Sequence, residues 1–337
     1  MKRVLIPREV PATFIHSLPE AATSALAANF LNDQGHSIAI LVEESIPKAE
    51  EWGEDVAAFM ESLNPDQKVE FHLFDSVPDP NHPDAFEKIC ERMTILSSLI
   101  RTSPKRNHLL LIATTPEALV SPCPQHERQK KSELILSAGQ EYEFEKLCST
   151  LAVDFDYSSE ILCEEPGQFS VRGGLIDIYP VNGTEPARID FFGNEIEEIR
   201  SFDPSTQRGE AILDHLFISS AQSNQEIEVE GEFVRYLSEP VSWIFREPEE
   251  LTSKFPLVFH SANKASASQA SFANALIPER RKYDHFLGTS EIQAGAGIFE
   301  KLEALELPVR SDTLSAKRST FPDYGKDEFE SQKKHRA

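Results

Sequence analysis

The stretch that decides the fold is Gly167–Arg208, GQFSVRGGLIDIYPVNGTEPARIDFFGNEIEEIRSFDPSTQR. Its apolar and polar residues alternate as in half-buried strands, and glycines interrupt the alternation as turns do. Successive side chains of a strand point to opposite faces, so Ile189 and Phe191 are expected to point inward. Arg188 and Phe192 are then expected outward, together with Asp190. Aromatic and arginine side chains are enriched at protein interfaces, so this face is a candidate docking surface.

The glycines and the residue spacing of this stretch also predict its turns. Gly193 and Asn194 predict a two-residue type II′ hairpin turn, because that turn needs glycine at its first central position. Ile196 and Ile199 follow with an odd spacing, which predicts either a β-bulge in the next strand or an early end of that strand. Upstream, a strand that ends at Arg172 precedes two glycines, and a further strand follows them.

The same stretch closely resembles the UvrA-interaction domain that the repair protein UvrB shares with the bacterial transcription-repair coupling factors. Its ending, FDPSTQR, is more similar to the coupling factors. Weaker similarity to their N-terminal UvrB-like module extends over roughly residues 15–260. In that family, two arginines and the second phenylalanine of this block contact UvrA. The resemblance therefore implies that Arg172, Arg188 and Phe192 form the UvrA-binding site here.

The composition indicates a globular protein of two or three domains, with 337 residues, 40% hydrophobic residues and a mean hydropathy of −0.36. The first residues contain no sustained apolar run, so we expect no membrane span and a cytoplasmic location. The four cysteines lie far apart without a CxxC pair, which argues against a disulfide framework and against a metal site.

The net charge of −23 predicts weak or no direct DNA binding, because DNA affinity depends on neutralising phosphates with lysine and arginine. UvrB itself clasps DNA with a tyrosine-bearing hairpin. The similar place here, residues 75–84, contains three prolines and no tyrosine. Base stacking on an aromatic side chain is therefore not expected there.

Buried strands and helices on either side of the decisive stretch predict an α/β domain with a parallel sheet. Ser37–Val42 and Leu109–Ala113 are unbroken apolar runs, and Ala85–Leu99 has apolar residues at helical spacing. Later, Val241–Phe245 predicts a strand, Pro248 a helix start, and Leu257–Phe259 another short strand. We expect the first half of the α/β domain at residues 1–120 and its second half at residues 214–307, with the UvrA-interaction domain between them at residues 121–213. Residues 308–337 are expected to form a disordered tail.

The expected fold is thus a degenerate P-loop NTPase-like parallel sheet, similar to UvrB domain 1, with an inserted α+β UvrA-interaction domain. In the UvrB-like family a glycine-rich phosphate loop with a lysine precedes the first helix. The corresponding stretch here, Ser17–Ser24, has no glycine, Thr23 replaces the lysine and Glu20 adds negative charge. We therefore expect Ser17, Glu20, Thr23 and Ser24 to form a non-functional phosphate loop, with no catalytic residues and no cofactor.

Three hypotheses of function follow. The first is a non-enzymatic UvrA-binding adaptor of transcription-coupled nucleotide excision repair, which would not translocate by itself. The alternative is a UvrB-like helicase subunit with residual ATP or DNA binding. The third is that the docking face binds a C-terminal domain or a separate motor chain of the coupling factor, which is compatible with the first.

Overall fold

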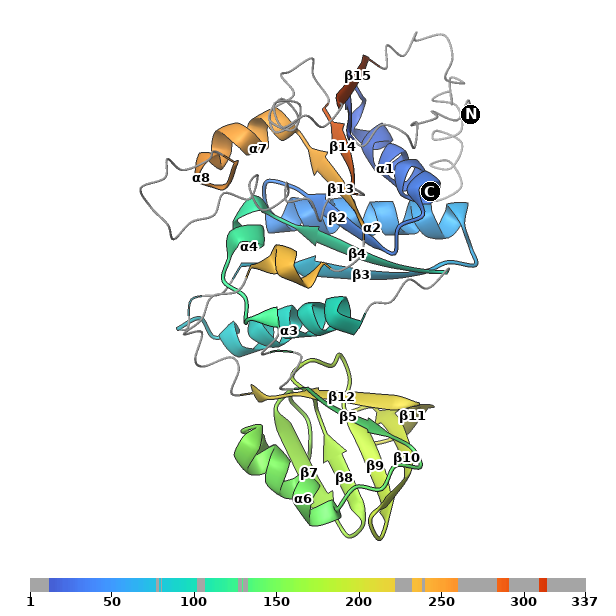
Figure 1. The fold of residues 1–337 in the computed structure, drawn as a ribbon, viewed down its shortest axis with the longest axis vertical. Coiled ribbons are helices and arrows are strands. Elements are labelled where there is room, and N and C mark those ends of the chain that lie inside the picture. Colours follow the sequence, from blue (N-terminus) through green and yellow to red (C-terminus); the bar gives the residue numbers. More distant parts are fainter. Residues whose placement is uncertain are drawn as a thin grey trace, which may run out of the picture.

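Figure 1 shows the computed structural model of the chain, which describes residues 12–76, 79, 81–101, 107–126, 129, 133–221, 232–237, 240–259, 284–290 and 309–313. An α/β unit, built from segments on both sides of residues 133–221, lies at the top of the view. A β-rich unit built from residues 133–221 lies below it. No helix of the described residues is both long enough and apolar enough to span a membrane.

The α/β unit is built on a seven-stranded parallel sheet with the order β15-β1-β14-β13-β2-β4-β3. Its strands are β1 (Ala12–His16), β2 (Ile38–Val42), β3 (Lys68–Phe74), β4 (His108–Thr114), β13 (Val241–Arg246), β14 (His285–Thr289) and β15 (Val309–Thr313). The expected strands at 37–42, 109–113 and 241–245 are therefore present as β2, β4 and β13. β13, β14 and β15 follow the lower unit in sequence but pair within this sheet, so the flanking segments build one domain.

Helices cover both faces of this sheet, because its central strands are apolar on both sides. The helices α1 (Glu20–Gln34) and α2 (Ile46–Leu63) pack on one face. The opposite face is covered by α3 (Ala85–Arg101), α4 (Pro116–Val120), the 3₁₀ turn η3 (Phe233–Tyr236), α7 (Pro248–Lys254) and α8 (Pro256–Phe259).

The prediction of a strand at Leu257–Phe259 is wrong, because these residues belong to helix α8. A run of three apolar residues has no readable period, so the sequence could not separate a strand from a helical turn. Pro256 stands at the first position of α8, where a proline is well tolerated. Val258 and Phe259 then pack against the core from outside the sheet.

The lower unit consists of a six-stranded sheet, a two-stranded sheet and one short helix, all packed on a separate core. The six-stranded sheet has the order β11-β10-β9-β8-β7-β6. These strands are β6 (Ser158–Ser159), β7 (Gln168–Arg172), β8 (Leu175–Ile178), β9 (Ala187–Phe192), β10 (Glu195–Phe202) and β11 (Gly209–Ile212). The small sheet pairs β5 (Glu133–Ser137) with β12 (His215–Ser219), while α6 (Phe144–Ser149) continues into the π-helical turn η1 (Thr150–Asp154).

Two of the expected boundaries need correction. The interaction domain does not end at residue 213, because β12 pairs with β5 and Leu216 and Ile218 complete the core of the lower unit. The tail from residue 308 onward is not wholly irregular, because β15 pairs with β1 at the edge of the parallel sheet. Strands that pair with such distant segments carry no pattern in their own sequence that indicates the pairing, so the sequence did not reveal these boundaries. Residues 308 and 314–337 lie outside the described residues.

The hairpin β9–β10 has the predicted alternation and turn. Ile189 and Phe191 are buried, Arg188 and Asp190 are partly exposed, and Phe192 is exposed. Gly193 has a φ of +65°, as a type II′ turn requires at its first central position. The register between the two strands shifts between Ile196 and Glu198, where the bulge was expected.

Helix α3 joins the two units, and Figure 1 shows it between the parallel sheet and the lower unit. Cys90 of α3 packs into the core of the lower unit. Arg101 at the end of α3 donates to Glu133 at 2.8 Å and lies 4.4 Å above the ring of Phe217. These contacts join the lower unit to the α/β unit.

The edge strand β3 places one carboxylate between two imidazoles, which gives the fold a pH-dependent element. Glu70 contacts His72 and His108, each at 2.9 Å. The hydrogen bond with His72 is the main cause that lowers the pKa of Glu70 to about 2. The ordinary pKa of 4.5 applies in the unfolded chain, so this stabilisation is present above pH 4.5 and is lost as the pH falls toward 2.

We therefore expect Glu70→Gln to lower the thermal unfolding midpoint above pH 4.5, and the gap to wild type to close as the pH falls toward 2. Differential scanning calorimetry at stepped pH measures this gap. The variant Glu54→Gln, which removes an exposed carboxylate of α2, is the control. A difference in unfolding midpoint between wild type and Glu70→Gln that stays constant at every pH would contradict the lowered pKa of Glu70.

Candidate docking surface

The three residues predicted to bind a partner lie on the outer face of the six-stranded sheet, away from the core of the lower unit. Arg172 ends β7, Arg188 is near the start of β9 and Phe192 ends β9. Their exposure differs: the Phe192 residue is 74% exposed, whereas the Arg172 side chain is 44% exposed and the Arg188 side chain 18%. The ring is therefore accessible, and Arg188 is more enclosed than the alternation predicted.

Both arginines converge on Asp177 of β8, which the sequence analysis did not identify. Asp177 pairs directly with Arg188 in the β8–β9 register. Arg188 donates from Nε and Nη2 to its two carboxylate oxygens at 2.6 and 2.8 Å, and Arg172 Nη2 lies 3.6 Å from Oδ2. Asp177 is 2% exposed, so one buried carboxylate forms a fork-shaped pair with Arg188 and an ion pair with Arg172.

Hydrogen bonding to Asp177 raises the pKa of Arg188, so its positive charge is fixed. The guanidinium also lies 5.0 Å above the ring of Phe202. Asp177 interrupts the apolar run of β8. Its side chain lies on the outer face of the sheet, beside its cross-strand partners Ser170 and Arg188. A charged residue inside such a run was the signal that could have revealed it.

The segment between β6 and β7 encloses one side of this arginine pair. The carbonyl oxygen of Ile161 accepts from Arg172 Nη2 at 3.5 Å. The side chain of Ile161 is itself 88% exposed, and Cys163 is fully buried. Burial raises the pKa of the Cys163 thiol to about 12, with the nearby charge of Asp177 adding to the effect. Cys163 is therefore a neutral packing residue beside the arginines.

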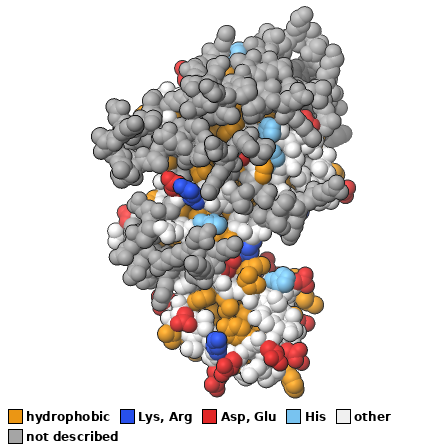
Figure 2. Space-filling view, viewed as in Figure 1, with side chains coloured by type: hydrophobic (Ala, Val, Ile, Leu, Met, Phe, Trp, Pro, Cys, Tyr) orange, Lys and Arg blue, Asp and Glu red, His pale blue; other side chains and the backbone are white. Residues whose placement is uncertain are grey.

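The ring of Phe192 lies apart from the arginine pair. Phe192 is four residues from Arg188 on the same strand, which places the two about 13 Å apart along the sheet. Its direct cross-strand partner is Glu195, and Asp190 precedes it on the same face. Figure 2 shows acidic side chains around the lower end of the interaction domain, where the β9–β10 hairpin turns. The ring therefore projects among carboxylates.

The four residues assigned to a degenerate phosphate loop surround the start of α1. Ser17, Leu18 and Pro19 alone connect β1 to α1, and Ser17 has a φ of +60°. Thr23 and Ser24 lie within α1 and are buried. Helical backbone begins at Glu20, whose side chain lies outside the description. The connection is much shorter than the glycine-rich stretch of a phosphate loop, which places backbone N–H groups around a phosphate.

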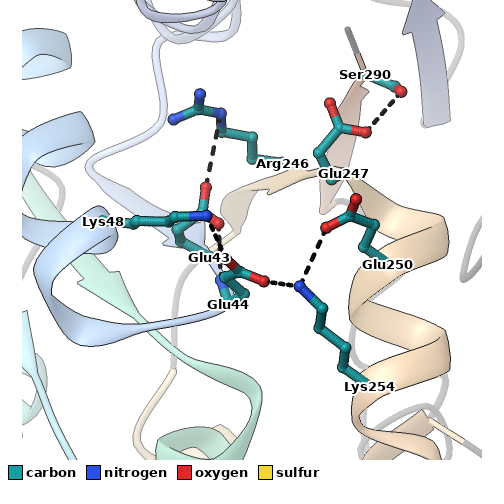
Figure 3. A network of polar contacts seen from close by, with 8 residues as sticks. All are labelled: Glu43, Glu44, Lys48, Arg246, Glu247, Glu250, Lys254 and Ser290. Carbon is teal, nitrogen blue, oxygen red and sulfur yellow. Dashed lines mark hydrogen bonds and ion pairs between the residues drawn. The ribbon is translucent and has the colours of Figure 1, made fainter. Parts of the chain in front are cut away.

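The carboxyl ends of the parallel strands, where open α/β sheets bind ligands, carry an ion-pair network in this chain. Figure 3 shows it between the end of β2, the end of β13 and α7. Arg246 Nε lies 3.7 Å from Glu43, whose pKa burial raises. Glu44 accepts from Lys254 and Lys48, and these bonds lower its pKa. This edge thus concentrates carboxylates that protein cations neutralise.

Within the described ranges, no three His, Cys, Asp or Glu side chains are grouped so that they could hold a metal ion. The four cysteines are free thiols.

Comparison with known proteins gives a family for the lower unit. Residues 134–223 match the family described as the UvrB interaction domain. The chain is 37% identical over 99 residues to the transcription-repair-coupling factor of Bacillus subtilis, covering 29% of this chain and 8% of that protein. It is 24% identical over 221 residues to the transcription-repair-coupling factor of Staphylococcus aureus strain Mu50, covering 66% of this chain and 18% of that protein.

The chain therefore spans less than a fifth of the length of these relatives. The family match begins in β5 and ends just after β12, so it coincides with the lower unit and includes every residue of the candidate docking surface. Residues 134–223 of this chain thus match the UvrB interaction domain, within a region similar to the transcription-repair-coupling factors.

Proposed function

We propose that this chain is a UvrA-binding adaptor of transcription-coupled nucleotide excision repair, without ATPase or translocase activity of its own. One observation carries the proposal: Arg172, Arg188 and Phe192 share the outer face of a sheet that matches the UvrB interaction domain. The ring of Phe192 is an accessible apolar anchor, of the kind that dominates binding energy at protein interfaces.

The two arginines have a different role from the ring in this proposal. Their shared contact with Asp177 stabilises β7, β8 and β9 in one register and leaves Arg172 with the more accessible guanidinium. Arg172 is then the cation that offers hydrogen bonds to a carboxylate of UvrA. Arg188 acts as a positioning residue, because its Nε and Nη2 already donate to both oxygens of the buried Asp177.

The lack of ATP chemistry is part of the proposal. Two features support it: the short connection between β1 and α1, and the carboxylates Glu43, Glu44 and Glu247 at the ligand-binding edge of the sheet. Lys48, Arg246 and Lys254, the cations that a polyphosphate would need at this edge, already pair with Glu43, Glu44 or Glu250.

Isothermal titration calorimetry with purified UvrA tests the adaptor proposal. We expect the whole chain to bind UvrA saturably, without any nucleotide bound to the chain itself. Absence of binding heat, together with separate elution of the two proteins in gel filtration, would refute it. A C-terminal domain or motor chain of the coupling factor, added to the same titration, should compete with UvrA if it covers the same face.

A thermal shift assay with magnesium and ATP tests the proposal that the chain does not bind or hydrolyse ATP. Ligands that bind only the folded state raise the unfolding midpoint. We expect the midpoint to stay unchanged with ATP. A concentration-dependent rise, or phosphate release stimulated by DNA, would instead support the UvrB-like helicase subunit.

A further inference from the structure

A hollow with a volume of about 410 Å³ opens at the hairpin end of the interaction domain, lined by Phe191 and Gly193, which flank Phe192 in sequence. Two glycine turns, two phenylalanines and two glutamates line it: Gly173–Gly174, Gly193–Asn194, Phe144, Phe191, Glu143 and Glu145. The turns keep it open because three of their four residues lack a side chain. Gly174 cannot carry one without strain, because a Cβ there would lie 2.9 Å from the carbonyl oxygen of Phe191.

The hollow is acidic and partly aromatic. Glu143 and Glu145 are exposed at the start of α6, and no lysine or arginine belongs to the lining. Lys146 follows them in sequence, but its ammonium lies 5.9 Å from the ring of Tyr142. Phe144 and Phe191 meet edge to face, with ring centroids 5.2 Å apart. Carboxylates beside phenylalanine rings suit a cation that carries an apolar stem.

The surroundings of the hollow have the same charge. Glu195 pairs with Phe192 across the hairpin, and Glu141 bridges to Glu195 from the segment before α6. The basic side chains of the outer face lie further along the sheet, where Asp177 neutralises Arg188 and Glu198 contacts Arg200 at 2.6 Å. Phe192 and the hollow thus lie at the same acidic end of the sheet, with the ring of Phe192 on its outer face.

From this geometry we propose that the hollow binds an arginine or lysine side chain of the docking partner, and that the partner surface facing Phe192 is basic. The inference rests on the proposed function for the identity of the partner, UvrA, and adds the chemistry of its contact. The carboxylates of Glu143 and Glu145 pair with the cation, and its stem packs against Phe144 and Phe191. Phe192, on the outer face at the same end of the sheet, contacts the partner separately.

Charge reversal at the rim tests the inference in the whole chain. We expect Glu143→Lys/Glu145→Lys to weaken UvrA binding at least tenfold and to reduce the association rate, measured by surface plasmon resonance. The matched control is Glu51→Lys/Glu54→Lys, which makes the same charge change on exposed positions of α2. Wild-type affinity of the rim variant, or equal losses in both double variants, would overturn the inference.

A second measurement does not depend on UvrA. Titration with an arginine amide, followed by amide NMR signals of Gly173, Gly174 and Gly193, should shift these signals. Citrulline amide, which has the same shape without the charge, should not. If UvrA fails to bind while the arginine amide shifts the glycines, the proposed function fails and the cation site remains. If UvrA binds but neither the titration nor the rim variant has an effect, only the cation site is refuted.

Discussion

Phe192→Ala is expected to weaken binding to UvrA by about 2 kcal/mol or more, which corresponds to a loss of affinity of about 30-fold. The physical reason is that the substitution removes the accessible ring of the docking surface, which is 74% exposed in the free chain. The same exposure means that the ring contributes little to folding, so the unfolding midpoint should remain near that of wild type. Calorimetric titration with UvrA measures the affinity, and thermal unfolding checks the fold.

The matched control is Ile135→Ala, which shortens another exposed apolar residue of the same domain, on β5. It should bind UvrA as wild type does. Equal affinity of Phe192→Ala and wild type would remove the ring from the interface. Arg188→Glu is a poor test of binding, because it would place a second carboxylate against the buried Asp177 and disturb the domain itself.

Asp177→Asn is expected to cost about 3 kcal/mol of folding free energy, the second large effect. Removing its charge leaves the mostly enclosed guanidinium of Arg188 without a counter-ion and weakens the contact to Arg172. Urea unfolding, followed by circular dichroism, measures the loss. Because the carboxylate is buried, its removal should act on stability before it acts on any partner.

Asp190→Asn is the control for this substitution, since Asp190 lies on the same face of the sheet but is partly exposed. Its unfolding free energy should stay within about 0.5 kcal/mol of wild type. If Asp177→Asn were as stable as Asp190→Asn, the arginines would not depend on the shared carboxylate, and their position would need another cause.

Strand alternation in Arg188–Phe192 and the glycine at position 193 were sufficient to predict the β9–β10 hairpin and the outward direction of Phe192. The unbroken apolar runs of β2 and β4 likewise predicted strands buried on both faces of a parallel sheet. These features depend on a few neighbouring residues, so the local sequence contains all the information that they need.

Other features depend on pairing between distant segments. Asp177 meets Arg188 because of the register between β8 and β9, and the alternation within either strand does not give that register. The same reason explains why β12 extends the interaction domain and why β15 joins β1. The sequence by itself determined which face each docking residue occupies. Only the tertiary structure decided that the arginines share one buried carboxylate while the ring projects at a separate, acidic end, because neighbours across a sheet are set by strand register.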